Sequence, residues 1–552
     1  MNKTIGIDLS SDRLLNVASD LVDRHDYIGA LKMLNKNAEL NFNDEDAYML
    51  YAEIFDDIGL HERCVNNWFR FMDCALGDDL VEAYEGLAVA YMNLGNEHFS
   101  AYYYNQLLMS SDEIDPEMRG EIMNAFLSRD ENPLKFVYPP AIADCSDVMS
   151  EGVDKMRRGD YDAAIDEFEK VEEDNPSYLS ARNYIAMCNI ISDRCEQAEA
   201  ECLAVLRKNP DSVQALTTLA AVRTEQKKSE ESRELARRLL KLDVNGTDDI
   251  YKIATVCCEN KMHEEAFNLF KKLEGEMRYD SSVLFFKAVS AFNCGRYEDC
   301  FEAFDRLITL KPEAVIAKYH YDAARSAAES GETKEMSYFY RMPQEEREAS
   351  LKLLAACTKL TNAQSEKLFA EVDITDCVLW CFDETEGSGE SELQLLASVC
   401  AVKAGLDNLL RDTLLNAFLS DGLKVKILTL IGERNEDNTF GVVLCHLYKK
   451  VAFRALNLGR LKRKNFLRAY ATLTAHFGII DIANGEAFAC AAEKLYKKLE
   501  EDGRLAAASN CDALCAAIYH LSGVSEPDVR RDKLASFFDA DEKKISALLG
   551  DK

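Results

Sequence analysis

The sequence predicts an all-α fold: an α-solenoid of helical hairpins followed by a mainly helical C-terminal region. Two features of composition point to this class, because the 552 residues include only nine prolines and 47% of them are hydrophobic. Few prolines and few turn-rich stretches favour long helices over many short strands. The apolar content is enough for a sizeable packed core. The third observation, a sequence period, is the strongest.

Residue types recur every 34 positions between residues 145 and 314, in frames that begin at 145, 179, 213, 247 and 281. The eighth position of each frame is small: Gly152, Ala186, Ala220, Ala254 and Ala288. The twenty-fourth position fills the space beside it with Phe168, Cys202, Ala236, Phe270 and Phe304. Three frames carry a proline at the thirty-second position: Pro176, Pro210 and Pro312. This spacing predicts two helices per frame that approach closely at the small residues, with a turn at the proline.

One such hairpin cannot bury its apolar face alone, so neighbouring hairpins must stack. The pattern, together with "GDY" at 159–161 and "GRY" at 295–297, resembles the tetratricopeptide repeat family. The resemblance implies a concave groove lined by the first helix of each hairpin. It also implies a role in binding proteins or peptides.

The period divides the chain into four segments. A weaker array with frames at 11, 45 and 81 precedes the main one. We expect an N-terminal array of three repeats at 1–114 and a helical connector at 115–144. We then expect a main array of five repeats plus a capping helix at 145–335, and a C-terminal helical region at 336–552. That last region weakly resembles HEAT repeats, and its end, "KLASFFDADEKKISALL", has the spacing of a helix-turn-helix.

Recognisable catalytic chemistry is missing from the sequence. It contains no GxxxxGK[ST], HExxH, GxSxG or GxGxxG motif, so we expect no enzyme activity, no cofactor and no metal. Of the 18 cysteines, several occupy core positions of the repeats, where we expect small buried hydrophobes. No signal peptide or apolar run of membrane-spanning length is present, which predicts a cytoplasmic protein that does not enter a membrane.

Charge is distributed unevenly along this acidic chain, which has a formal net charge of −32. Residues 1–150 hold 28 acidic against 10 basic residues. Five acidic side chains fall on the groove positions of the N-terminal array: Asp46, Glu53, Asp56, Glu82 and Glu85. They form either an acidic groove for a basic peptide or protein, or an ordinary solvated helical face.

The groove positions of the main array are more apolar. They carry Met149, Asn183, Met187, Tyr251, Phe285 and Phe292, among others. Such residues suit a helix or an extended peptide, although some of them could instead pack against the next hairpin. The lysine, arginine and asparagine residues with which this family clamps the acidic C-terminal tails of chaperones are missing, so we expect no such partner.

The C-terminal region carries a basic stretch, because residues 438–480 contain no Asp or Glu. Its cations are Lys449, Lys450, Arg454, Arg460, Lys462, Arg463, Lys464 and Arg468. They could bind phosphates, or dock on the acidic N-terminal array in the same or another copy. We therefore expect a non-enzymatic scaffold or adaptor that binds protein or peptide partners in its grooves. The alternative is a regulator whose C-terminal region binds nucleic acid while the repeats sense a protein or peptide.

Overall fold

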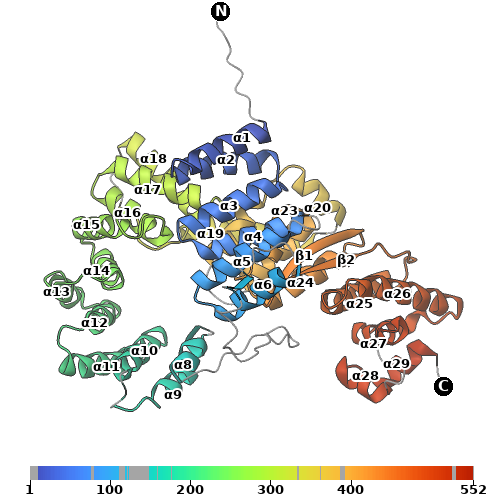
Figure 1. Ribbon diagram of the computed structural model, residues 1–552. Coiled ribbons are helices and arrows are strands. Elements are labelled where there is room, and N and C mark those ends of the chain that lie inside the picture. Colours follow the sequence, from blue (N-terminus) through green and yellow to red (C-terminus); the bar gives the residue numbers. More distant parts are fainter. Residues whose placement is uncertain are drawn as a thin grey trace, which may run out of the picture.

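The computed structural model describes residues 10–75, 80–110, 119–120, 122, 148–157, 159–173, 175, 177–331, 335–360, 362–385, 392–524 and 530–550. The predicted all-α repeat fold is confirmed, since helical hairpins make up most of this part of the chain. Figure 1 shows the hairpins following one another along the chain, with the C-terminal helices on the right. Almost the whole of the predicted connector at 115–144 lies outside the described residues.

Three hairpins open the chain. Their helices are α1 (Ser11–Val22), α2 (Tyr27–Leu40), α3 (Glu45–Asp57), α4 (His61–Cys74), α5 (Leu80–Asn93) and α6 (Glu97–Ser110). The small residues predicted at the helix crossings are fully buried, as Ala18, Ala52 and Ala88 show. These small alanine side chains therefore allow the two helix backbones to approach closely.

The second array has the same construction. Its helices are α8 (Val148–Arg157), α9 (Tyr161–Phe168), α10 (Tyr178–Ile191), α11 (Cys195–Lys208), α12 (Val213–Glu225), α13 (Ser229–Leu239), α14 (Thr247–Glu259), α15 (His263–Glu274), α16 (Ser281–Asn293), α17 (Tyr297–Leu310) and α18 (Val315–Ser330). In Figure 1 these helices describe an arc on the left of the molecule.

Each hairpin of the second array bends through one residue in the left-handed backbone region. Gly159 and Gly295 have φ values of 82° and 74°, which glycine adopts without strain. Asp193, Lys227 and Lys261 adopt φ values of 59°, 60° and 55° at the equivalent position. The turn geometry is therefore kept where glycine is lost, and the period continues without a break.

The C-terminal region begins with a group of six helices, two of which contact helices of the arrays. They are α19 (Gln344–Lys359), α20 (Asn362–Phe369), α21 (Thr375–Glu384), α22 (Glu392–Ala404), α23 (Asp407–Leu415) and α24 (Asp421–Gly432). The chain ends in α25 (Arg463–Phe477), α26 (Ala483–Glu501), α27 (Cys511–Ser522), α28 (Arg531–Phe537) and α29 (Glu542–Leu549). The turn predicted near Asp539 does separate α28 from α29, and Asp539 itself has a φ of 49°.

A β-hairpin that the sequence reading missed stands between these helix groups. Strand β1 (Asn438–Leu444) pairs antiparallel with β2 (Leu447–Phe453). The two-residue loop places Cys445 and His446 at φ values of 48° and 59°, and positive φ at both loop residues is typical of a type I′ hairpin turn. The strands contribute buried side chains such as Phe440 and Val451 to the core.

The N-terminal array and the end of the second array share one apolar core. Buried residues of both belong to a single cluster that includes Phe69 and Phe304, and the hairpin contributes Val443 to it. The two arrays are therefore joined as one body.

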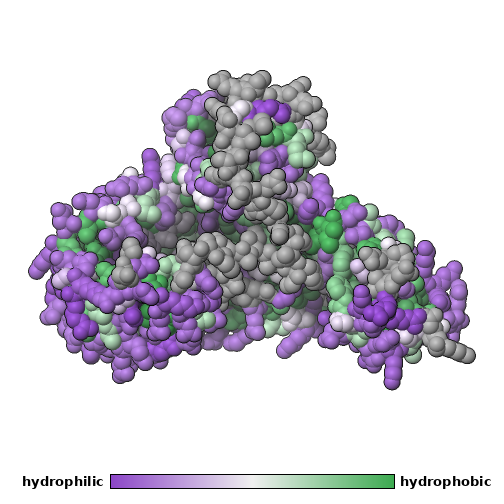
Figure 2. Space-filling view, turned by 60° about the horizontal axis from the view of Figure 1, so that its bottom comes forward, coloured by the Kyte–Doolittle hydropathy of each residue, from purple (hydrophilic) through white to green (hydrophobic). Residues whose placement is uncertain are grey.

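Figure 2 shows one face of the molecule. The left-hand lobe, where α10 to α15 lie, is mostly hydrophilic, and hydrophobic residues gather toward the lobe of α25 to α29.

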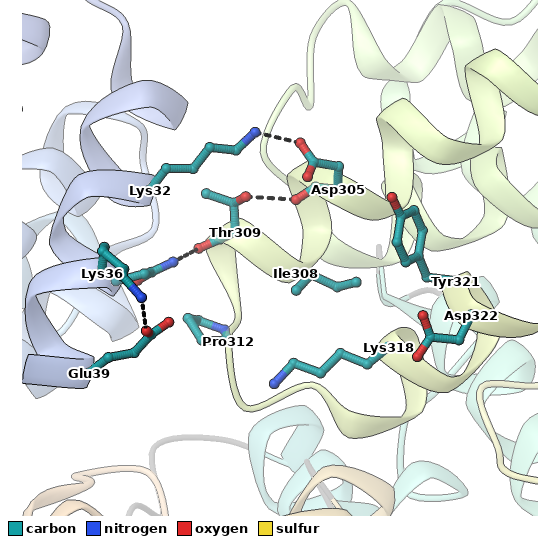
Figure 3. Close-up of a pocket in the computed structure, with 11 residues that line it drawn as sticks. Lys32, Lys36, Glu39, Asp305, Ile308, Thr309, Pro312, Lys318, Tyr321 and Asp322 are labelled. Atoms are coloured by element: carbon teal, nitrogen blue, oxygen red, sulfur yellow. Dashed lines mark hydrogen bonds and ion pairs between the residues drawn. The ribbon is translucent and has the colours of Figure 1, made fainter. Parts of the chain in front are cut away.

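Helix α2 meets α17 and α18 across an open cleft of about 460 Å³ (Figure 3). The Lys32 ammonium lies 2.6 Å from the Asp305 carboxylate, and the Asn35 amide donates to the backbone carbonyl of Thr309 at 2.9 Å. Lysines and carboxylates line the cleft in equal number: Lys32, Lys36, Lys318, Glu39, Asp305 and Asp322. With its charges balanced, this cleft favours neither an anion nor a cation, and it serves as the seam between the arrays.

Candidate binding groove

The first helices of the second array form a continuous lining. Helices α10, α12 and α14 lie side by side in chain order. Their groove positions fall into two parts that differ in exposure. The part formed by α8 and α10 is open, although Thr217 on the adjoining α12 is buried, and the part formed by α14 and α16 is covered.

In the open part, Met149, Asn183 and Met187 are only half-buried. The side-chain oxygen of Asn183 is buried and has no hydrogen-bond partner. Gln214, on the neighbouring helix, donates its amide to the sulfur of Met187 at 3.8 Å. The open part therefore presents soft, partly exposed apolar groups, and the oxygen of Asn183 lies beneath its surface.

Tyr251 stands at the border between the two parts. It is half-buried, and its ring meets Phe270 and Phe286 edge-on at 5.9 and 6.2 Å. Burial raises the pKa of its hydroxyl above the ordinary value. The side chain is thus held in place by its neighbours while part of it stays accessible.

The prediction that Phe285 and Phe292 line an accessible groove is wrong. Phe285 is 2% exposed and Phe292 is 7% exposed. Phe292 packs edge-on against Tyr297 of the next helix at 5.6 Å, which makes it an interhelical core residue. Phe285 meets the ring of Tyr340 at 4.9 Å, so it is covered by a segment that lies outside the repeats.

That segment is Glu335–Arg341, which we call the strap. Its side chains alternate: Met336 is buried and Tyr338 and Tyr340 are half-buried, whereas Ser337 and Phe339 are exposed, Phe339 to 80%. The alternation persists although the backbone bends at 338–341, where the N–H of Arg341 donates to the carbonyl of Phe339 at 2.8 Å. The strap therefore points every second side chain into the groove.

Hydrogen bonds hold the backbone of the strap. The Asn293 amide donates to the carbonyl of Met336 at 2.9 Å, and its oxygen accepts the N–H of the same residue at 2.8 Å. His320 lies 3.2 Å from the carbonyl of Arg341. Both ends of the strap are thus fixed by side chains of α16 and α18.

The two inward tyrosines reach polar groups with their hydroxyls. Tyr338 lies 2.8 Å from His263 Nδ1, and burial lowers the pKa of His263, which favours the neutral imidazole. Tyr340 donates to both oxygens of the buried Asp383 carboxylate at 3.0 and 3.1 Å. The alternation in "EMSYFYRM", ahead of Pro343, is the sequence signal that could have revealed the strap.

The acidic residues predicted for the N-terminal groove lie on α3 and α5. Asp46, Glu53, Glu82 and Glu85 are exposed, and within the described residues none of them forms an ion pair. Burial and the nearby charges of Asp57 and Glu82 raise the pKa of Glu53. Asp56 differs, since it contacts His61 and Asn93. The structure thus concentrates like charge on this face.

The basic residues lie on β2, on α25 and on the segment that joins them. Lys449, Lys450, Arg460, Arg463 and Lys464 are exposed. Two others are engaged: Arg454 pairs with Glu486 and Glu493 at 3.0 and 3.1 Å, and Arg468 lies 3.7 Å from Glu433. Lys462 is half-buried where α25 begins. Across the described ranges, none of these cations pairs with the acidic face of α3 and α5.

Buried cysteines act as core residues. Burial raises the pKa of Cys202 and of Cys300 to about 12, which keeps both thiols protonated. Among the residues that the structure describes, no group of three or more histidine, cysteine or acidic side chains is placed to hold a metal ion. Within the same residues, no helix combines the length and the apolar character that crossing a membrane requires.

Comparison with known proteins supports the repeat assignment. Residues 155–222 match the model of a tetratricopeptide repeat family. The hairpins of both arrays make the chain a helical repeat protein, and this match identifies residues 155–222 as tetratricopeptide repeats. Repeats of this kind serve as scaffolds for protein interactions. The comparison with curated proteins found no match.

Solved structures resemble the chain only distantly. A tetratricopeptide repeat protein from Parabacteroides merdae is 15% identical, covers 51% of this chain and 98% of its own, and has a TM-score of 0.25. Human IFIT1, as a dimer with PPP-AAAA, is 14% identical over 77% of this chain and 90% of its own, with a TM-score of 0.28. Yeast Tom70 is 13% identical over 90% and 98%, with a TM-score of 0.20. We infer nothing about partners from these structures.

Proposed function

We propose that this protein is a non-enzymatic interaction scaffold, and that the open part of the second-array groove binds a segment of a partner protein. One observation carries the proposal: the same groove already holds a segment of its own chain, the strap, which contacts Asn293 and Phe285 of α16 and packs Tyr338 against the core that includes α14. The lining continues into α8 and α10, where Met149, Asn183 and Met187 are half-buried. A partner segment there would bury the exposed apolar surface of these side chains.

The experiment is selection of peptides from a displayed library against the full chain. We expect enriched peptides to lose binding to Met187→Glu, which places a charge in the open part. Leu203→Glu is the matched control, because Leu203 is an exposed apolar residue (42%) on α11, the second helix of the same hairpin. Peptides that bind both variants equally, or a selection without enrichment, would contradict the proposal.

The acidic face of α3 and α5 extends the scaffold with a surface suited to a basic partner. Glu53 and Glu82 are close enough for the charge of one to raise the pKa of the other. A partner with lysine or arginine side chains would relieve that repulsion. We expect Glu53→Lys/Glu82→Lys to abolish salt-sensitive binding of a basic peptide, while Asp46→Asn alone weakens it slightly.

Nucleic-acid binding is the second candidate function. It is favoured by the exposed cations Lys449, Lys450, Arg460, Arg463 and Lys464, none of which forms an ion pair within the described part of the chain. Phosphate contacts weaken steeply as salt rises. A gel shift of single-stranded RNA or duplex DNA by the full chain at low salt, lost at high salt, is the expected result for this candidate. No shift at low salt would exclude it.

We also propose that the protein resides in the cytosol. The cysteines in the described residues are all free, as expected in a reducing compartment.

A further inference from the structure

We propose that the strap is an internal ligand, which occupies the α14–α16 part of the groove and competes with a partner for it. The site would accept a peptide that is extended at an apolar residue and bends after it, with tyrosines at the next two alternate positions, the pattern of Met336, Tyr338 and Tyr340. This rests on the proposed function, since it assumes that the groove binds segments of other proteins. It adds the class of segment and a means of regulation.

The groove recognises the backbone of the strap independently of its side chains. Asn293 uses both ends of one amide on the N–H and the carbonyl of a single residue, Met336. An amide can make this pair of bonds with any residue that presents an extended backbone. The position therefore sets the conformation of the ligand but not its sequence.

Sequence selectivity comes from the sites that receive the two tyrosines. Tyr338 stacks on His263 with ring centroids 5.7 Å apart, and its hydroxyl lies 2.8 Å from that imidazole. Tyr340 packs against Phe285 and donates to Asp383, whose side chain is 1% exposed. A segment with phenylalanine at these positions would leave buried polar groups with one hydrogen bond fewer, so the site discriminates against it.

The strap is held less firmly than the core beneath it. Phe339 is 80% exposed, Glu335 is exposed, and Met336 is the one residue of the strap that is buried. The covered residues of α16, in contrast, are within the core: Phe285 is 2% exposed and Val289 is fully buried. A segment with few buried groups opens at lower free energy than the core does. The strap can therefore leave the groove while the helices stay folded.

Release of the strap from the groove would also remove a contact with the C-terminal region. Tyr340 joins the groove to Asp383 on α21, and the same carboxylate accepts the N–H of Ile316 at 2.9 Å and lies 3.4 Å from Lys311. A partner that displaces Tyr340 removes one contact between α16 and α21. Because the strap is tethered, its effective concentration is in the millimolar range or above. The intact protein should bind a competing segment correspondingly more weakly than an emptied groove would.

The test uses the full chain and a fluorescent peptide with the sequence of residues 335–342. The release variant is Tyr338→Ser/Tyr340→Ser, which empties both tyrosine sites for the added peptide. We expect it to bind the peptide at least about tenfold more tightly than the natural chain. Adding Asn293→Ala to the release variant should weaken that binding at least severalfold. A peptide of the same composition in which Tyr338 and Phe339 exchange places should not compete.

Equal affinity of the natural chain and the release variant, or no effect of Asn293→Ala, overturns the proposal. If the release variant does not fold, chymotrypsin cleavage of the natural chain at Phe339 provides a second measurement. Added peptide should accelerate that cleavage and the exchanged peptide should not; no acceleration overturns the proposal. Library peptides that depend on Met187 while the strap peptide fails would leave the scaffold function standing and refute this inference alone.

Discussion

The hydroxyl of Tyr103 donates a hydrogen bond of 2.6 Å to the backbone carbonyl of His446, which lies 343 residues further along the chain. Tyr91 meets Nδ1 of the same histidine at 2.8 Å, and the imidazole lies 4.5 Å from the ring of Phe99. The turn of the β-hairpin thus docks on the last N-terminal hairpin, α5–α6. In a longer array, the next hairpin would stack there.

Acid should weaken this junction. Burial and the charge of Lys424 lower the pKa of His446 to about 4, although Asp421 opposes the shift; the tyrosines that face it, Tyr91 and Tyr103, are neutral. An unfolded histidine titrates near 6.5, so the stability contributed by the neutral imidazole is present above about pH 6.5 and is lost as the pH falls toward 4. Between pH 7.5 and 5 the loss is about 2 kcal/mol. Urea unfolding at both pH values measures it, and His446→Gln should lose about that much less stability than the natural chain over the same interval.

Phe285 and Met187 occupy related positions in the repeat but should respond differently to truncation. Phe285→Ala leaves a cavity beneath the strap and should lower the free energy of unfolding by about 3–5 kcal/mol. Met187→Ala, in the open part, should cost about 1 kcal/mol or less, because the side chain is only half-buried. Denaturant titrations of the two variants compare them directly. Similar small losses in both would mean that Phe285 is not a core residue.

Gly86→Ala should destabilise the N-terminal array, although alanine normally favours a helix by about 1 kcal/mol over glycine. A Cβ at residue 86 would lie 2.1 Å from a ring carbon of Trp68. Either the indole or helix α5 must move, at a cost of about 1–3 kcal/mol. Glu85→Ala, one residue away and exposed, serves as the control and should leave the melting temperature nearly unchanged. A rise in melting temperature for Gly86→Ala would contradict this close contact.

Binding to heparin, a polyanion, should distinguish the exposed basic side chains of the basic stretch from those that are held in ion pairs. Arg463→Glu/Lys464→Glu should elute from a heparin column at clearly lower salt than the natural chain, because both residues are exposed and without ion pairs among the described residues. Arg454→Ala should change elution little, since its guanidinium is bound to Glu486 and Glu493. If all three proteins pass through at low salt, the basic stretch does not form an anion-binding surface.

Residues that repeat along the chain were the ones the sequence could place. Small residues such as Ala186 and larger ones such as Phe168 recur every 34 positions. This period defines the hairpins, the small residues where their helices cross, and the bends between the helices. The accessibility of the groove side chains was harder to predict, because it depends on the strap, a segment that lies outside the repeats. Phe285 and Met187 both lie on the groove face of a first helix. Only Phe285 is covered, and the residue that covers it, Tyr340, lies some 55 residues further on.

The β-hairpin was missed for a related reason. Its turn is Cys445–His446, which lacks the Asn-Gly or Asp-Gly pair that usually marks a type I′ turn. The positive φ values at both residues are instead supported by contacts with Tyr91 and Tyr103. Local sequence carries no trace of partners more than 340 residues away.

The shared core at α16–α18 gives the second array the mechanics of a cantilever. One end is clamped, because α16 to α18 share their core with the N-terminal array. The far end is different: residues of α8 to α10 form a small core of their own, around Phe168 and Ile185. As far as the described residues hold the array, a force applied by a bound partner would bend it about its clamped root, with displacements that grow toward α8. The open part of the groove lies on the compliant arm, and the strap lies at the rigid root.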